Sequence, residues 1–140
     1  MKKITKTEKE TIALAKKLAQ SFVGGEVVGL IGDLGAGKTI FTKGIASGLG
    51  IKNNINSPTF VLMKVYPIKK GSIKNFVHID AYRINNYKDL EVIGADEYFN
   101  DPKSLVVVEW ADRVKLKSKI KKAKLIYLTN KGEHSRLIEF

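Results

Sequence analysis

The sequence predicts an α/β fold in which a mixed β-sheet is flanked by helices. Short continuous apolar runs, typical of buried strands, alternate with segments whose apolar residues recur at helical spacing. A chain of 140 residues fits one domain, and its 44% hydrophobic and 28% charged residues are typical of a globular protein. We therefore expect a single domain over residues 1–140 that closes with a C-terminal β-hairpin.

The first half of the chain alternates helix and strand. Residues 7–10 have the form of a capping box, and the apolar spacing that follows predicts a helix over about 7–22. Residues 27–31 form the continuous apolar run of a strand buried on both faces. A glycine-rich loop at 32–38 and a helix at 39–49 are expected next.

The second half of the chain is richer in predicted strands. Apolar runs predict two antiparallel strands, a further buried strand and a closing hairpin, at 60–66, 73–79, 105–108, 124–129 and 135–140. One or two short helices are expected over 87–99 and a short helix or loop near 113–120. The arrangement therefore has the alternation of strands and helices that a mixed sheet requires.

Composition excludes several functional classes. The chain has no cysteine, so disulfides, thiolate catalysis and cysteine zinc sites are excluded, and two histidines are too few for a histidine-rich metal site. No apolar run approaches the roughly 18 residues that span a bilayer. Residues 1–11 are charged and lack the apolar segment of a secretory signal. We expect a cytoplasmic protein without a membrane partner.

The net charge of +11 is unevenly distributed. Between Arg113 and Lys131 the chain has eight basic residues and no acidic one. One interpretation is a patch for nucleic acid or an acidic partner. The other is a solvated lysine-rich surface, which the scarcity of arginine and the absence of an aromatic-interleaved RNA motif favour.

Residues 32–39 carry the strongest functional signal. They read Gly-Asp-Leu-Gly-Ala-Gly-Lys-Thr and fit the G-x-x-x-x-G-K-[ST] phosphate loop, or Walker A motif. The glycines let backbone N–H groups surround phosphate oxygens, while Lys38 reaches the β/γ-phosphates and Thr39 ligates Mg²⁺. We expect a P-loop NTPase-like domain with Mg²⁺ and a nucleoside triphosphate held by Asp33, Leu34, Gly35, Ala36, Gly37, Lys38, Thr39 and Ile40.

Two carboxylates compete for the second metal position. Asp80 and Glu109 each end an apolar run, which is where the acid of a P-loop site stands. Either acid can hold the metal or position the attacking water, and the sequence leaves this division open. Thr59 is a candidate switch residue, although Ser-Pro-Thr at 57–59 is also a common turn.

Two further residues near these acids have alternative interpretations. His78 is expected to be a structural histidine rather than a base, because it stands alone in the middle of a strand. Trp110 directly follows Glu109 and either packs near the site or belongs to the core.

Other nucleotide-binding classes fit less well. A dinucleotide fingerprint needs a glycine where Ile40 stands. A GTPase needs Asp-x-x-Gly, which residues 80–83 lack, and an Asn-Lys-x-Asp base reader, in which residues 130–133 have Glu in place of Asp. A small P-loop kinase needs an acceptor site and a lid bearing arginines, and the chain has three arginines.

Taken together, five segments resemble the TsaE (YjeE) family. They are Glu10-Thr11 followed by Leu14-Ala15, the phosphate loop at 32–39, Ser57-Pro58-Thr59-Phe60, His78-x-Asp80-x-Tyr82-Arg83, and Val108-Glu109-Trp110. The resemblance runs in order over about residues 5–115 and is far more specific than the phosphate loop alone. The chain departs from it after Trp110, where variants containing proline are common in the family.

The resemblance implies a slow, Mg²⁺-dependent ATPase required for N6-threonylcarbamoyladenosine at position 37 of tRNA. Such a protein acts on a complex of two partner subunits, TsaD and TsaB, and reaches tRNA indirectly through that complex. Asp80 and Glu109 become the site acids, with Glu109 the metal ligand, and Thr59 the switch residue. Glu8, Thr11 and Arg136 are expected to contact the adenosine of ATP or ADP. The alternatives are a nucleotide-gated binding module, in which hydrolysis is secondary, and a small P-loop kinase.

Overall fold

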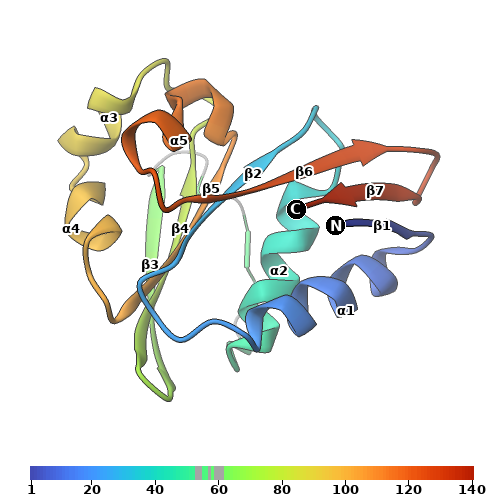
Figure 1. Cartoon of the computed structure of the whole chain (residues 1–140), viewed down its shortest axis with the longest axis horizontal. Helices are drawn as coiled ribbons and strands as arrows, with labels where there is room; N and C mark the ends of the chain where they lie inside the picture. Colours follow the sequence, from blue (N-terminus) through green and yellow to red (C-terminus); the bar gives the residue numbers. More distant parts are fainter. Residues whose placement is uncertain (53–54, 57, 59–61) are drawn as a thin grey trace.

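The computed structural model describes residues 1–52, 55–56, 58 and 62–140, in which seven strands form one mixed sheet (Figure 1). The strands are β1 Lys2–Thr5, β2 Val27–Ile31, β3 Met63–Lys70, β4 Ile73–Asp80, β5 Ser104–Glu109, β6 Lys124–Asn130 and β7 Arg136–Glu139. Their order is β1-β7-β6-β2-β5-β4-β3, and β4, β5, β2 and β6 run parallel. The predicted mixed α/β fold is confirmed.

Helices cover both faces of this sheet. They are α1 Glu8–Ala19, α2 Lys38–Gly48, α3 Tyr87–Val92, α4 Ala95–Phe99, the 3₁₀ helix η1 Ala111–Val114 and α5 Leu116–Lys119. Val28 and Leu30 of β2 pack in the core beneath α1 and α2, whereas Val27 belongs to the core on the opposite face. Since successive side chains of a strand alternate between faces, burial on both sides explains the continuous apolar run of β2.

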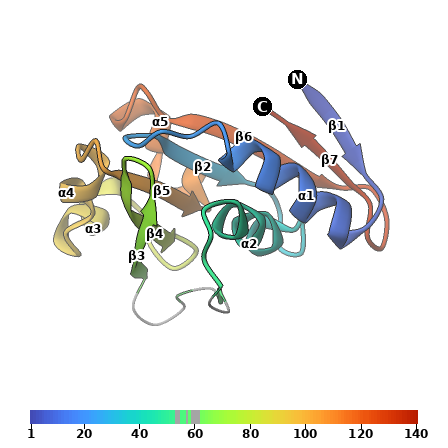
Figure 2. The same cartoon turned by 90° about the horizontal axis from the view of Figure 1, so that it is seen from below.

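The helices α1 and α2 lie side by side on one face of the sheet (Figure 2). A Cβ atom on Gly44 would lie 2.6 Å from the Ala15 Cβ, and one on Gly48 would lie 2.7 Å from the Ala19 Cβ. The two helix backbones therefore cross in direct contact, which only glycine on α2 allows. This contact fixes the direction of α2, whose first turn follows the phosphate loop.

The first helix begins as the sequence predicts and ends earlier. The Thr7 side chain accepts a hydrogen bond from the Glu10 N–H at 3.1 Å, which is the N-cap expected from the capping box. The helix ends at Ala19 rather than Phe22, because the Phe22 N–H donates to the Ala19 carbonyl in a tighter turn.

The N-terminal strand β1 is missing from the sequence prediction. It pairs antiparallel with β7, and the Phe140 N–H donates to the Met1 carbonyl at 3.0 Å, so the two termini lie together (Figure 1). Three of the four residues of β1 are exposed, so the segment has no apolar run to reveal it. Its strand conformation comes from backbone pairing with β7, which a local pattern cannot contain.

The remaining elements follow the predicted order with shifted boundaries. β3 and β4 form the predicted antiparallel hairpin, although β3 runs from Met63 to Lys70, and residues 60–61 lie outside the described part of the chain. The helical region at 87–99 is two short helices, and the C-terminal hairpin of β6 and β7 is confirmed. Among the described residues, no helix combines the length and apolarity needed to cross a membrane.

Candidate functional site

The phosphate-loop motif lies between the end of β2 and the start of α2. Gly35 and Gly37 have positive φ angles of 81° and 97°, a backbone conformation that other residues adopt at a penalty. Gly37 is the N-cap of α2, so the backbone N–H groups of the first turn are free to face an anion. The strand before the loop and the helix after it are thus those the motif requires.

Lys38 is held against its own loop. Its Nζ donates to the carbonyls of Gly32 at 2.6 Å and Asp33 at 2.8 Å, and it lies 3.9 Å from the ring centroid of Trp110. Burial lowers the pKa of Lys38 from its ordinary value of 10.5, although the carboxylate of Glu109 and other nearby acids oppose the shift. The ammonium group is therefore held in the loop by carbonyl groups of the loop itself.

Glu109 has contacts to side chains on two different elements. Its Oε1 accepts from the Thr39 hydroxyl at 3.0 Å, and its Oε2 lies 2.5 Å from the His78 Nε2. The Thr42 hydroxyl lies 3.4 Å from the same Oε2, but its single hydrogen has a shorter bond at 2.9 Å to the Lys38 carbonyl. Glu109 is 2% exposed, so this carboxylate is buried and held on both oxygens.

Asp80 lies beside Glu109 at the same edge of the sheet. The two residues are directly paired in the register of β4 and β5, at the carboxyl ends of parallel strands, where α/β sheets bind their ligands. The Asp80 Oδ1 accepts from the Tyr82 N–H at 3.0 Å. The structure thus brings together the two acids that the sequence singled out.

A cleft of about 500 Å³ joins the loop, the two acids and the C-terminal hairpin. It is lined by Glu8, Leu34, Gly35, Gly37, Lys38, Thr39, Ile40, Asp80, Tyr82, Arg83, Glu109, Trp110 and Arg136. Most of the predicted site residues are therefore on one concave surface of the size that ligand sites have.

Three predicted site residues have other positions. Asp33 is exposed on the loop, and Ala36 is buried beneath it. Thr11 is buried, its hydroxyl 2.6 Å from that of Thr5, and it lines a small recess beside the cleft rather than the cleft itself. Thr59 lies outside the described residues.

Arg136 connects the hairpin to the phosphate loop. Its guanidinium donates to the Gly35 carbonyl at 3.1 Å and to the Ser135 carbonyl at 2.9 Å. The same group donates to the Asn130 Oδ1 at 3.2 Å in the turn of the hairpin. The arginine that the sequence linked to adenosine thus holds the wall of the cleft in place.

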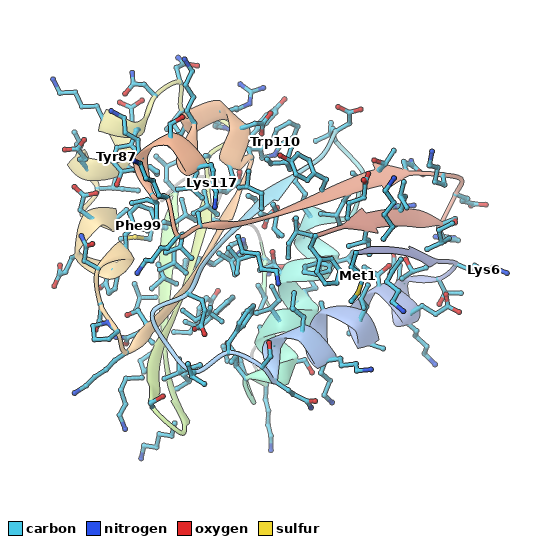
Figure 3. All side chains as sticks on the ribbon, in the orientation of Figure 1. Met1, Lys6, Tyr87, Phe99, Trp110 and Lys117 are labelled. Atoms are coloured by element: carbon cyan, nitrogen blue, oxygen red, sulfur yellow. The ribbon has the colours of Figure 1, made fainter. Side chains whose placement is uncertain are left out.

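Two aromatic side chains, Tyr82 and Trp110, also line the cleft. The rings of Tyr82 and Trp110 are 5.0 Å apart, and the Arg113 guanidinium carbon lies 4.9 Å and 5.2 Å from their centroids. Figure 3 shows Trp110 above β2, on the chain that leads from β5 into η1. Of the two interpretations of Trp110, the structure supports the one that puts it at the site.

His78 makes a contact with Glu109 that the sequence analysis did not predict. It is buried, as expected of a structural histidine, but it faces Glu109 rather than apolar groups alone. The spacing contained a usable signal, because residues two apart on a strand point to the same face, and Asp80 was already a candidate.

The oxygen atoms gathered here suit a hard divalent cation. The Thr39 hydroxyl and the carboxylates of Glu109 and Asp80 are the ligand types that Mg²⁺ prefers. Across the described ranges there is no group of three or more His, Cys, Asp or Glu side chains that could hold a metal. These oxygen atoms could share such a cation with the phosphates of a ligand.

Comparisons with known proteins give a consistent result. Residues 5–138 match the family model described as Threonylcarbamoyl adenosine biosynthesis protein TsaE. The chain is 38% identical to the tRNA threonylcarbamoyladenosine biosynthesis protein TsaE of Bacillus subtilis over 97% of this chain and 82% of that protein. It is 40% identical to the protein of the same name from Aquifex aeolicus, over 80% of this chain and 77% of that one. A crystal structure of YdiB from Bacillus subtilis has a TM-score of 0.74 and 34% identity, and covers 99% of this chain and 82% of that structure.

Proposed function

Because the chain belongs to the TsaE family of threonylcarbamoyl adenosine biosynthesis proteins, we propose that it is a P-loop ATPase required for N6-threonylcarbamoyladenosine formation in tRNA. The relatives are named for that biosynthesis, and the ATPase assignment is our own. One observation carries it: the Thr39 hydroxyl of the phosphate loop donates to the buried Glu109 carboxylate at 3.0 Å. A loop threonine bonded to a strand-end acid is the arrangement that binds a metal–nucleotide complex in P-loop enzymes.

The loop residues supply the phosphate-binding groups. The backbone N–H groups at the start of α2 would bind phosphate oxygens, and the helix N-terminus favours their negative charge. Lys38 would exchange its bonds with the carbonyls of Gly32 and Asp33 for the β- and γ-phosphates. This exchange is favourable because each carbonyl is a weaker partner for an ammonium than a charged phosphate oxygen.

The two acids have different surroundings, and we assign them different roles. Glu109 is bonded to Thr39, so the pair would hold Mg²⁺ on the loop side of the cleft. Bound Mg²⁺ would neutralise the charge on the phosphate oxygens as the terminal phosphoryl group leaves. Asp80 lines the cleft beside Glu109, so it would orient the attacking water and accept its proton.

The mouth of the cleft has the character of a protein-binding surface. Leu34 on the phosphate loop is 78% exposed and Tyr82 is 42% exposed. Exposed apolar side chains at the rim of a site are typical of a surface that a partner covers. We propose that the TsaD–TsaB complex binds here and raises a slow basal turnover.

Contact with tRNA is proposed to be indirect. In the basic stretch, the Lys117 ammonium donates to the carbonyls of Lys121 and Ala123, both at 2.7 Å, so it is committed to its own turn. We therefore assign no tRNA contact to Lys117. A single domain working in the cytoplasm, with ATP and Mg²⁺ as its ligands, completes the proposal.

The test is ATP hydrolysis by the purified protein, alone and with TsaD and TsaB from the same source. We expect slow release of phosphate that rises when both partners are present. Strong hydrolysis that ignores the partners would contradict the role in tRNA modification and leave the phosphate-loop assignment intact. Repeated tRNA modification with a non-hydrolysable ATP analogue would instead favour the gated binding module, and a phosphorylated acceptor would indicate a small kinase.

A further inference from the structure

The ring of His78 contacts Glu109 at the centre of the sheet. Its Nε2 lies 2.5 Å from the Glu109 Oε2, and the exposed fractions of the two residues are 0% and 2%. A hydrogen bond to a carboxylate in such a dry environment is strong, because no water competes for either group.

The other nitrogen of the ring identifies which atom donates. The His78 Nδ1 is buried and has no hydrogen-bond partner among the described residues. A buried N–H without an acceptor is more unfavourable than a bare ring nitrogen, and the Glu109 carboxylate requires a donor. The hydrogen of the imidazole is therefore assigned to Nε2, pointing at Glu109.

The sheet register explains why this contact forms. His78 and Asp80 lie two apart on β4, so they share a face, and Asp80 is paired directly with Glu109. The Glu109 side chain consequently has Thr39 on one oxygen and His78 on the other. Its carboxylate is fixed from two sides by groups on different elements, α2 and β4.

We propose that His78 is a positioning residue that orients the Glu109 carboxylate for the divalent cation of a bound metal–nucleotide complex. This inference rests on the proposed function of the cleft. His78 is fully buried and is not among the residues that line the cleft, so it acts through Glu109 rather than by touching the nucleotide. Residues that hold a metal-binding carboxylate in this way typically change metal affinity by about 10- to 100-fold.

A pair of amide substitutions tests the geometry. In His78→Gln the side-chain nitrogen stands at the distance of the imidazole Nε2 from the backbone, so it can still donate to Glu109. In His78→Asn the same amide stands at the distance of Nδ1 and falls short. Both variants replace the ring with a primary amide at the same buried position, so they share the loss of the imidazole and differ by the one methylene that sets the reach of the amide.

The measurement is the affinity of the whole chain for ADP. Calorimetry determines this affinity in EDTA and at a series of Mg²⁺ concentrations. We expect His78→Asn to need about 10- to 100-fold more Mg²⁺ than the unaltered protein to reach its full affinity for ADP. We expect His78→Gln to stay within a few-fold of the unaltered protein. In EDTA all three proteins should bind ADP equally.

Two controls separate the possible failures. Phe99→Leu removes packing from α4, far from Trp110 in Figure 3, and should lower thermal stability without changing the Mg²⁺ requirement. Lys38→Ala should abolish ADP binding; if it binds normally, the proposed function fails. If Lys38→Ala loses binding but both histidine variants need the Mg²⁺ concentration of the unaltered protein, only the role of His78 is overturned. Equal loss of ADP affinity in EDTA by both histidine variants would also overturn it.

Discussion

Thr39 and Glu109 are 70 residues apart in the chain, and the Thr39 hydroxyl donates to the Glu109 Oε1 at 3.0 Å. The contact exists because β2, which leads into the phosphate loop, pairs in parallel with β5, which ends at Glu109. The pairing of β2 with β5 thus brings the start of α2 next to Glu109 at the end of β5. The predictions below follow from the groups around this contact.

Neutral replacements of Asp80 and Glu109 should change different kinetic properties of ATP hydrolysis. Asp80→Asn should lower kcat for ATP hydrolysis about 10²- to 10⁴-fold while ADP binding is kept, because the water loses its base. Glu109→Gln should instead raise the Mg²⁺ requirement. Steady-state hydrolysis with TsaD and TsaB over a Mg²⁺ series measures both effects. The exposed Glu97→Gln on α4 is the control, and identical profiles for the two acid variants would refute the division of roles.

Stability should depend on pH through Lys38. Burial lowers the pKa of Lys38 in the folded protein below the ordinary value of 10.5, so the unfolded chain holds more protons between these two values. The free energy of unfolding of the unaltered protein should therefore rise, relative to Lys38→Met, as the pH increases toward 10.5. Urea unfolding of both proteins in EDTA measures the difference. A difference that does not change with pH would show that the lysine is not shifted.

Trp110 should report nucleotide binding by fluorescence. It is the single tryptophan of the chain, and the Lys38 ammonium lies 3.9 Å from its ring centroid. Moving that cation to a phosphate changes the field at the indole, so ADP should produce a saturable change in emission. The change should be absent in Lys38→Ala. Calorimetric binding of ADP with no change in emission would show that Lys38 keeps its position.

The glycines of α2 should be intolerant of even one added methyl group. Gly44→Ala places a Cβ 2.6 Å from the Ala15 Cβ and 2.7 Å from the Ile12 carbonyl oxygen. Overpacking should lower the free energy of unfolding by about 1–3 kcal/mol, against the gain of about 1 kcal/mol that alanine gives an open helix. The exposed Ser47→Ala on the same helix should be neutral or slightly stabilising. Urea unfolding distinguishes them, and a stabilised Gly44→Ala would contradict the close crossing.

ADP binding should depend on the shape of the Arg136 side chain as well as on its charge. Its guanidinium reaches Gly35 on the loop and Asn130 in the hairpin at once, which a single ammonium cannot do. Arg136→Lys should weaken ADP binding about 10-fold, the equivalent of losing one hydrogen bond to a charged group. Lys131→Ala, in the turn of the same hairpin, is the matched control. Unchanged affinity in Arg136→Lys would show that the loop holds its shape alone.

Local patterns identified the elements whose signal lies within a few residues. The continuous apolar run of β2, the N-cap at Thr7 and the glycine-rich loop each need only neighbouring side chains to be recognised. The same holds for the order of strands and helices along the chain. The sequence analysis did not predict β1, because its strand conformation comes from pairing with β7 at the other end of the chain.

The candidate site divides in the same way. Lys38 and Thr39 belong to one contiguous motif, and Asp80 and Glu109 stand at the ends of apolar runs, so the sequence determined which residues to consider. Only the tertiary structure decided that Glu109 contacts Thr39 and His78, and that Arg136 reaches Gly35. The physical reason is that strand register and helix packing set these contacts, and both depend on pairings between residues far apart in the chain.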